Sequence, residues 1–264
     1  MALKRVRDYL TTYLLLAFLA VLILGWTILA LLLLGPLPRR WRRAGARHTM
    51  MAGSRLFSHA LTLTGAYELD LTAIDRLRGG PPVILAPNHP TSIDAILFLT
   101  RHPDLVCILK PALLNNFFLG AGARLAGFIR SEPPLRMIRD AITELRRGAV
   151  VLLFPEGTRT IRQPVNALTG SVAAIARHAQ APIQVALIET DSPYLGKGWP
   201  FFKAPSLPIR YRVRLGSRLP APPDKASCLE ALQALEREYA EQLSQAPQRA
   251  WIAASALNPR SLAR

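Results

Sequence analysis

Two short polar motifs, each directly after an apolar run, carry the residue types that could do chemistry in this chain. The first is Asn88-His89-Pro90-Thr91-Ser92-Ile93-Asp94, which follows apolar residues ending at Ala86. Pro90 disfavours a helical backbone at His89 and suits the first turn of a helix, so His89 is expected on a loop where a helix begins. The bend at Pro90 allows the Asp94 carboxylate to turn back to one ring nitrogen of His89.

A histidine oriented by a carboxylate is a general base, and this is the chemistry that the first motif predicts. One nitrogen of His89 would take a proton from an attacking hydroxyl, while Asp94 fixes the tautomer and stabilises the imidazolium. Such a base needs no activated serine. The structural alternative is that His89 caps or packs and that Asp94 is an ordinary acid at a helix N-terminus. The spacing alone does not decide between them.

The second motif is Phe154-Pro155-Glu156-Gly157-Thr158-Arg159, at the end of another apolar run. It places a glutamate, a glycine that tolerates unusual dihedrals and a guanidinium on one loop. Ligands of α/β proteins bind at the carboxyl ends of the strands, where an arginine grips phosphate through two parallel hydrogen bonds. The alternative is a surface turn with a solvated Glu156 and Arg159.

Apolar runs alternate with helical patterns from residue 83 onwards, which predicts an α/β domain. Continuous apolar runs of this kind fit strands that are covered on both faces. The expected fold class is therefore a mixed, largely parallel sheet flanked by helices, preceded by an N-terminal membrane-inserted helical pair. The expected strands are 83–86, 105–109, 149–154 and 183–188, and the expected helices are 92–101, 134–147 and 167–179.

Two more elements are expected towards the end of the chain. Apolar residues alternate with arginines over 209–215, which predicts a half-exposed strand at the sheet edge with a solvated arginine face. Apolar residues at helical spacing over 229–243 predict an amphipathic helix, followed by a loose tail. The predicted domains are 1–64, a membrane anchor and interfacial helix; 65–218, the α/β domain; and 219–264, the C-terminal helix and tail.

The N-terminal part predicts a membrane anchor. No charged residue lies between Tyr9 and Pro38, and residues 14–34 form an apolar segment that at about 1.5 Å per residue crosses a hydrocarbon core of roughly 30 Å. The segment ends in leucines and an arginine cluster instead of a cleavage site, which favours an uncleaved anchor. A weaker helical pattern over 46–64 predicts a second helix in the membrane interface. A spanning helix and a pair inserted from one side both fit this pattern.

The net charge of the chain indicates which partners it binds, and the distribution of its basic residues indicates its orientation in the membrane. Its 33 Lys and Arg exceed its 17 Asp and Glu, giving a net charge of +16 that favours phosphate-bearing partners, either anionic lipid or nucleic acid. The heavier basic cluster follows the apolar segment, which predicts the inner (cytoplasmic) membrane with the catalytic domain on the cytoplasmic side. The cysteines Cys107 and Cys228 have neither a disulfide framework nor a metal spacing.

Together the two motifs resemble those of the lysophospholipid and glycerophosphate acyltransferases, typified by 1-acylglycerol-3-phosphate acyltransferase. His89 and Asp94 match the family's HxxxxD motif, and 154–159 matches its FPEGTR motif in the expected order. Lys110 and Gly127-Phe128-Ile129-Arg130 are similar to the family's lysine and its second, arginine-bearing motif. The resemblance covers roughly residues 65 to 216, and the N-terminal helical pair also fits the family's architecture.

The resemblance implies an acyltransferase in which His89 is the general base and Asp94 orients it. The acceptor hydroxyl would attack the thioester of acyl-CoA or acyl-carrier-protein, so the implied partners are membrane lipid and an acyl carrier, with no nucleic acid. The thioester supplies the activation, so neither a metal nor another cofactor is implied. The residues implied to bind the acceptor anion or to shape its loop are Lys110, Arg130, Glu156, Gly157, Thr158 and Arg159.

Two departures from the family pattern leave the acceptor open. The family's Val-Pro-Val-like strand is here Ala181-Pro182-Ile183, followed by Gln184, and its aromatic and lysine before a glycine are here Ala167-Leu168-Thr169-Gly170. The favoured acceptor is lysophosphatidic acid or a related lyso-lipid. The alternatives are a lyso-amino-acid lipid and a lipid-linked polyene pigment.

Other classes of protein explain less of the sequence. A serine hydrolase would need a GxSxG motif, which is absent, as are a P-loop, HExxH and GxGxxG. A membrane-tethered phosphate or nucleic-acid binder without catalysis would explain the charge but not His89 with Asp94. Finally, Trp199, Phe201 and Phe202 lie close to lysines, a combination typical of the headgroup boundary, which predicts that this loop contacts the membrane. The alternative is that these rings fold back onto the core.

Overall fold

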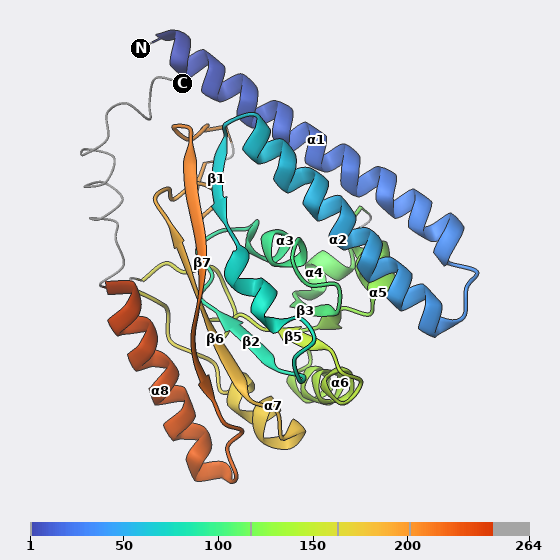
Figure 1. Cartoon of the computed structure of the whole chain (residues 1–264), viewed down its shortest axis with the longest axis vertical. Helices are drawn as coiled ribbons and strands as arrows, with labels where there is room; N and C mark the ends of the chain where they lie inside the picture. The colour runs from blue at the N-terminus through green and yellow to red at the C-terminus, as the bar shows by residue number, and fades with distance from the viewer. Residues whose placement is uncertain (1, 117, 163, 201, 245–264) are drawn as a thin grey trace.

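A seven-stranded sheet forms the centre of the computed structural model, which describes residues 2–116, 118–162, 164–200 and 202–244 (Figure 1). Its strand order is β1-β7-β6-β2-β5-β3-β4, and each pair is parallel except β6 with β7. The predicted mixed, largely parallel sheet is therefore confirmed. The strands are β1 (Tyr67–Asp70), β2 (Ile84–Pro87), β3 (Leu105–Leu109), β4 (Ile129–Arg130), β5 (Val150–Leu152), β6 (Ile183–Thr190) and β7 (Ile209–Leu219).

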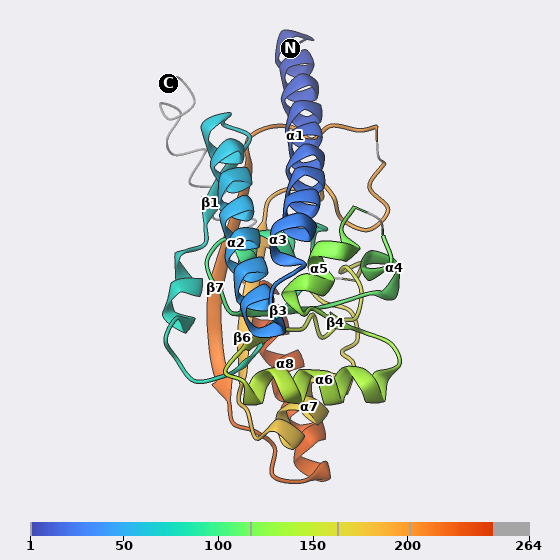
Figure 2. The ribbon, with the colours of Figure 1, turned by 90° about the vertical axis from the view of Figure 1, so that its right-hand side faces the viewer.

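Helices cover both faces of the sheet. One layer holds α2, α3 and the 3-10 helix η1, the other holds α6, α7 and α8, and α4 and α5 lie beside β3 and β4 (Figures 1 and 2). The C-terminal tail that the sequence predicts falls on residues 245–264, outside the described residues. The helices are α1 (Ala2–Leu34), α2 (Arg39–Leu63), η1 (Thr72–Leu77), α3 (Asp94–Leu99), α4 (Pro111–Leu114), α5 (Gly120–Ala126), α6 (Pro134–Arg146), α7 (Ser171–Ala179) and α8 (Lys225–Ser244).

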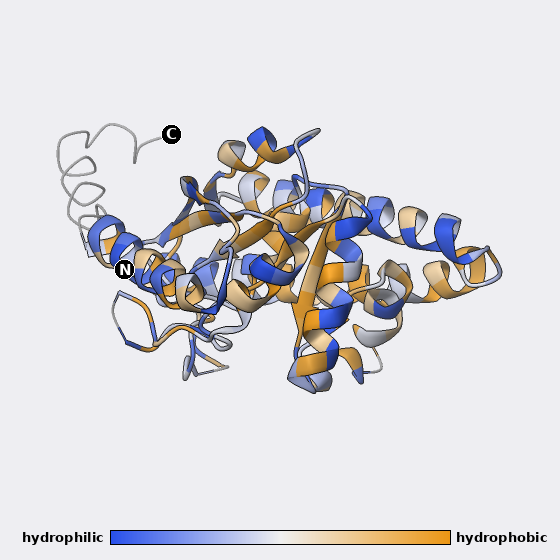
Figure 3. Cartoon of the chain, turned by 90° about the horizontal axis from the view of Figure 1, so that it is seen from below, coloured by the Kyte–Doolittle hydropathy of each residue, from blue (hydrophilic) through white to orange (hydrophobic). Residues whose placement is uncertain are grey.

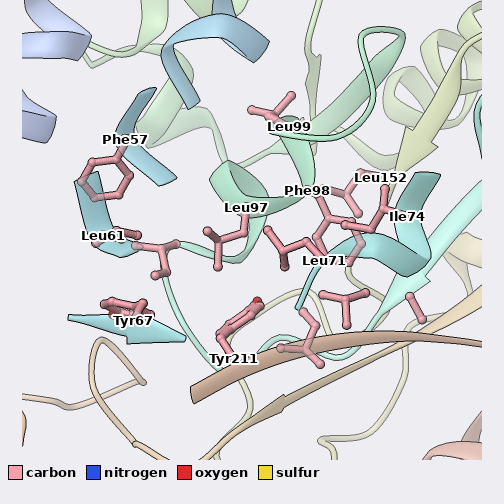
Figure 4. Packing of buried hydrophobic residues seen from close by; sticks show 14 of the residues in the cluster. Phe57, Leu61, Tyr67, Leu71, Ile74, Leu97, Phe98, Leu99, Leu152 and Tyr211 are labelled. Atoms are coloured by element: carbon pink, nitrogen blue, oxygen red, sulfur yellow. The ribbon is translucent and has the colours of Figure 1, made fainter. Parts of the chain in front are cut away.

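The two helical layers explain why the strands are apolar throughout. Successive side chains of a strand point to opposite faces, so each face needs its own apolar set. Leu85 and Leu152 belong to the core under α2 and α3, whereas their neighbours Ile84 and Val151 belong to the core under α6 and α7. Figure 3 shows the strands of the sheet as mostly hydrophobic, and Figure 4 shows the first of these cores.

The strand expected at the sheet edge lies inside the sheet, so that prediction is wrong. β7 lies between β1 and β6, because the four-residue strand β1 pairs with the side of β7 that faces away from β6. Its arginines therefore meet acids of the neighbouring strands: Arg212 Nε is 3.1 Å from Asp70 of β1, and Arg214 Nε is 2.7 Å from Glu189 of β6. The expected solvated arginine face is instead a row of cross-strand ion pairs.

The helices α1 and α2 form an antiparallel hairpin along one side of the sheet domain (Figures 1 and 2). Near one end of α1, the Leu207 N–H donates to the Asp8 carboxylate over 3.4 Å. Near its other end, Trp26 lies so close to α5 that a Cβ on Gly122 would overlap the indole ring. The helix therefore follows the surface of the domain over most of its length.

By length and composition α1 is apolar enough to cross a membrane, and it is the one such helix among the described residues. Only 17% of its most apolar window is buried, so most of that window faces outward. Side chains such as Leu14, Val21 and Leu32 are more than half exposed. The structure thus has one broad apolar surface on the outer side of the hairpin.

A buried glutamate fixes α2 to the sheet domain. Glu144 of α6 accepts hydrogen bonds from Arg43 and Arg47 of α2 over 2.6 and 2.7 Å, and from Arg147 over 2.6 Å. Burial alone would raise the pKa of the Glu144 carboxyl, but the hydrogen bond from Arg47, the charge of Arg43 and the hydrogen bond from Arg147 hold its pKa below the usual value. This carboxylate is a clamp between the hairpin and the sheet domain.

Replacing Glu144 with Gln should destabilise the protein, because Arg43 and Arg47 then lose a carboxylate in a largely buried place. We expect a loss on the order of 2–4 kcal/mol in the free energy of unfolding near neutral pH, measured by denaturant unfolding in detergent. In the native protein this stabilisation is complete above the usual pKa of 4.5 and is lost as the pH falls through the lower, folded pKa. The difference between the two proteins should therefore shrink in acid.

The control for this prediction is Asp140→Asn on the same helix. Asp140 and Arg136 form an exposed pair at 3.8 Å, and losing it should cost less than about 1 kcal/mol. Equal losses in the two variants would contradict the clamp.

Candidate active site

The predicted motifs meet at one edge of the sheet. The strands β2, β5, β3 and β4 are parallel neighbours, so their carboxyl ends lie side by side (Figure 1). His89 follows β2 and Glu156 follows β5, which places the two motifs next to each other. Lys110 follows β3, and Arg130 ends β4.

His89 and Asp94 are in direct contact, as the first motif predicts. Nδ1 of His89 is 2.8 Å from Oδ2 of Asp94, whose side chain is fully buried. Helix α3 begins at Asp94 and not at residue 92, because residues 91–93 form the turn that carries the carboxylate back to the ring. The His89 ring stacks on Phe154, with ring centroids 3.8 Å apart and an interplanar angle of 19°.

This arrangement engages one ring nitrogen of His89 and fixes the plane of the imidazole. Within the described residues nothing hydrogen-bonds to Nε2, and the side chain is 19% exposed. A base oriented in this way is able to take a proton at Nε2 from a hydroxyl that enters the site.

Asp94 has two partners that sequence reasoning missed. Thr91 donates its N–H to Oδ2 over 3.0 Å and its hydroxyl to Oδ1, and the Tyr211 hydroxyl donates to Oδ1 over 2.8 Å. Thr91 lies within the motif, so its position between His89 and Asp94 was a usable signal. Tyr211 is a buried residue of β7 and carries no local signal of this role.

Glu156 joins the second motif to the first. Its Oε1 accepts the His89 backbone N–H over 2.9 Å and the Thr160 hydroxyl over 2.6 Å, while Oε2 accepts the N–H of Asn166 over 2.8 Å. The Thr160 N–H in turn donates to the His89 carbonyl over 2.7 Å. Oε1 of Glu156 therefore holds the backbone that carries the histidine, while Oε2 holds the loop that follows the second motif at Asn166.

Gly157 and Thr158 complete the turn of the second motif. Gly157 has a φ of +64°, a left-handed conformation that glycine adopts without the cost of a side chain. Its N–H donates to the Phe154 carbonyl over 3.0 Å, which closes the turn. Thr158 is half-buried directly before Arg159.

Lys110 and Arg130 lie at the ends of the neighbouring strands β3 and β4. Leu109, the residue before Lys110, is paired with Arg130 in the parallel register of β3 and β4. Lys110 is exposed, and Arg130 Nη2 donates to the Asn115 side chain over 2.8 Å. Both cations therefore lie near the carboxyl ends of neighbouring strands, and their role as anion ligands stays a prediction.

Arg159 turns to the other side of β5. Its Nη1 donates to the Ser92 hydroxyl over 2.9 Å and to the carbonyls of Leu195 and Gly196 over 2.9 and 3.0 Å. These partners follow β2 and β6, so Arg159 points away from the surface of Lys110 and Arg130. Its hydrogen bonds hold the loop after β6, and its role as an anion ligand stays a prediction.

The loop after β6 forms a wall of a cavity of about 620 Å³ beside the histidine loop. Trp199 packs edge-on against the buried Tyr194, at 5.8 Å between ring centroids, and it donates Nε1–H to the Lys203 carbonyl over 2.7 Å. Tyr194 shares a core with Leu15 of α1, so the same loop contacts the hairpin. The residues lining the cavity include Asn88, Pro90, Thr160, Ile188, Gly196 and Trp199.

The aromatic residues of this loop do not behave alike. Trp199 folds back onto the core, whereas Phe202 is 80% exposed. Phe201 lies outside the described residues. Of the two described rings, Phe202 is the exposed one, and the membrane contact of this loop stays a prediction.

The cysteines and acids of the described residues are candidate metal ligands. Cys107 and Cys228 are both free, and burial raises the pKa of the Cys107 thiol to about 12. In the part of the chain that the structure describes, no three His, Cys, Asp or Glu side chains gather closely enough to hold a metal ion.

Comparison with known proteins identifies the class of enzyme. Residues 68–189 match the family model described as Acyltransferase, and this chain is therefore an acyltransferase. The matched residues include His89, Asp94 and the motif 154–159, which supports the lysophospholipid acyltransferase family that these motifs resemble.

The fold agrees with this family. It is similar to the crystal structure of PlsC, the 1-acyl-sn-glycerophosphate (LPA) acyltransferase from Thermotoga maritima, with a TM-score of 0.71. The two sequences are 17% identical, and the comparison covers 93% of this chain and 98% of that chain. At this identity the similarity concerns the fold, including the N-terminal apolar helix.

Replacing Arg159 with Ala should loosen the loop after β6, because the loop then loses hydrogen bonds to two of its carbonyls. Each such bond contributes about 1 kcal/mol, so amide hydrogen exchange over residues 192–203 should become faster by roughly ten-fold. Hydrogen-exchange mass spectrometry measures this directly. Arg162→Ala, an exposed arginine on the same loop as Arg159, is the control, and unchanged exchange in the Arg159 variant would refute the loop contact.

Proposed function

We propose that this acyltransferase is membrane-associated and moves a fatty acyl group from a thioester carrier to a hydroxyl of lysophosphatidic acid or a related lyso-lipid. The observation that carries the proposal is the contact between His89 and Asp94, at the sheet edge where Lys110 follows β3 and Arg130 ends β4. The first pair supports proton transfer, and the second supports binding of a phosphate-bearing acceptor. The Thermotoga PlsC, whose fold is similar, is an acyltransferase for an acceptor of this class.

In the proposed reaction His89 first accepts a proton and then returns it. Nε2 of His89 removes the proton of the acceptor hydroxyl while its oxygen attacks the thioester carbonyl. When the tetrahedral intermediate collapses, the C–S bond breaks and the leaving thiolate takes the proton back from the imidazolium. Asp94 keeps the ring in the required tautomer and stabilises the imidazolium between the two steps. The acyl carrier, acyl-CoA or acyl-carrier-protein, supplies the activation.

The acceptor anion would lie against Lys110 and Arg130. Phosphate oxygens accept charge-assisted hydrogen bonds from ammonium and guanidinium groups, and these bonds are stronger than neutral ones. Arg159, through the loop of Leu195 and Gly196, would shape the opposite side of the site. The lipid-linked alternatives, a lyso-amino-acid lipid and a polyene pigment, would use the same base with a different headgroup contact.

The outer face of the hairpin would rest in the membrane. Contacts near both ends of α1 with the domain favour a helix that lies in one leaflet over one that projects across the bilayer. Trp41 and the arginines 39–43 lie where α1 turns into α2, and this combination is typical of the headgroup region. The excess of basic residues after α1 supports the cytoplasmic side of the inner membrane.

Replacing His89 with Ala should lower turnover by on the order of 10²- to 10⁴-fold, because the base is lost while binding groups remain. The assay offers labelled acyl-CoA and acyl-carrier-protein with a panel of lyso-acceptors with and without phosphate. His178→Ala on the surface of α7 is the control and should keep native turnover. Near-native turnover of the His89 variant would rule out this base.

Replacing Lys110 and Arg130 with Ala should raise the acceptor's KM, because both groups are proposed to hold its phosphate. A lost charge-assisted hydrogen bond of about 1.5–3 kcal/mol corresponds to roughly 10- to 100-fold in affinity. The donor's KM should change much less. If the donor's KM changes and the acceptor's does not, these cations hold the phosphates of the acyl carrier instead.

A further inference from the structure

A buried tyrosine of β7 contacts the carboxylate that orients His89. The Tyr211 hydroxyl is 2.8 Å from Oδ1 of Asp94, although the two residues are 117 positions apart. Both side chains are fully inaccessible to solvent. Figure 4 shows the Tyr211 ring rising from β7 among the apolar side chains of the core, next to Leu97 of α3. The Tyr211 hydroxyl thus approaches Asp94 from the side of the sheet.

The two oxygens of Asp94 have separate sets of partners. Oδ2 faces His89 Nδ1 at 2.8 Å and the Thr91 N–H at 3.0 Å. Oδ1 accepts two hydroxyl groups, one from Thr91 and one from Tyr211. The donors on Oδ1 therefore set the rotation of the carboxylate and leave Oδ2 directed at the histidine.

The Tyr211 hydroxyl acts only as a hydrogen-bond donor to Asp94. Burial raises the pKa of its hydroxyl well above the usual value of 10, and the neighbouring Asp94 charge raises it further. The hydroxyl is therefore protonated over the whole range in which an enzyme works. A buried carboxylate is costly unless donors surround it, and Tyr211 supplies one of these donors from a strand that is fixed between β1 and β6.

We propose that Tyr211 is a positioning residue for acyl transfer, which fixes the Asp94 carboxylate and draws part of its negative charge away from His89. This inference rests on the proposed function. A carboxylate that shares its charge with two hydroxyls stabilises the imidazolium less strongly than an unshared one. The imidazolium therefore releases its proton more readily to the leaving thiolate.

Tyr211→Phe removes this donor and keeps the ring. Asp94 would then hold more charge on Oδ2, which stabilises the imidazolium, so His89 would be protonated up to a higher pH. Hydrogen bonds to charged groups are stronger than neutral ones, so the acidic limb of the kcat/KM profile should move upward by at least about half a pH unit. We expect kcat to fall by roughly ten-fold and both KM values to stay nearly unchanged.

The experiment compares Tyr211→Phe with Tyr239→Phe in the full-length protein in detergent. Tyr239 is also fully buried, and its hydroxyl donates to the Ala86 carbonyl over 2.7 Å, without contact to the catalytic pair. Two readouts are recorded, the pH profile of kcat/KM and the NMR titration of the His89 imidazole in ¹⁵N-histidine-labelled protein. Both should shift upward in Tyr211→Phe and remain native in Tyr239→Phe. A purely structural role would lower the stability of both variants and move neither titration.

A second variant covers the case in which Tyr211→Phe does not fold. A 3-fluorotyrosine at position 211 has nearly the same size and is a stronger donor, so it should move the His89 titration downward. An unshifted titration in either variant, with the wild type active, would overturn the role of Tyr211 alone. Wild-type protein that transfers no acyl group to any acceptor of the panel would instead overturn the proposed function, since the NMR titration needs no substrate.

Discussion

The negative charge of Asp94 lies in the interior of the protein, and much of the architecture follows from the need to satisfy it there. A buried carboxylate is tolerated only where donors surround it. The donors come from the turn before α3 and from β7, so a local turn and a distant strand must meet. This requirement explains what the antiparallel strand adds to a parallel sheet: it carries a hydroxyl under the first turn of α3.

The hydrogen bonds around Glu156 position the backbone of His89. A histidine side chain is positioned only as well as its backbone, and the His89 backbone belongs to a loop. Glu156 ties that loop to the end of the neighbouring strand through the His89 N–H, and Thr160 binds its carbonyl. Because β2 and β5 are paired, the two motifs hold one another in place without a direct contact between Glu156 and the imidazole. The glutamate of the second motif therefore supports the backbone of His89, the proposed base.

Local chemistry made part of this structure predictable. The strands are continuous apolar runs, and the His89–Asp94 contact spans five residues with a proline between, so both can be inferred from neighbouring residues. The role of Tyr211 could not, because its contact depends on the pairing of β7 with β6 and β1, segments far apart in the sequence. The same pairing places β7 inside the sheet, although its sequence pattern predicts an edge strand. The contacts of Arg159 could not be inferred either, because its residue type suggests an anion ligand. The carbonyls that accept its hydrogen bonds belong to a distant loop, which turns back at Leu195 with an uncommon φ of +60°.

The loop after β6 touches the hairpin on one side and encloses the cavity on the other. Tyr194 packs into the core that Leu15 of α1 shares, while Gly196 and Trp199 line the cavity beside the histidine loop. The described residues of this loop form neither a strand nor a helix that would make it independent of its two neighbours. A displacement of α1 at Leu15 would therefore reach the cavity wall through Tyr194, so the shape of the cavity is mechanically coupled to the position of the hairpin.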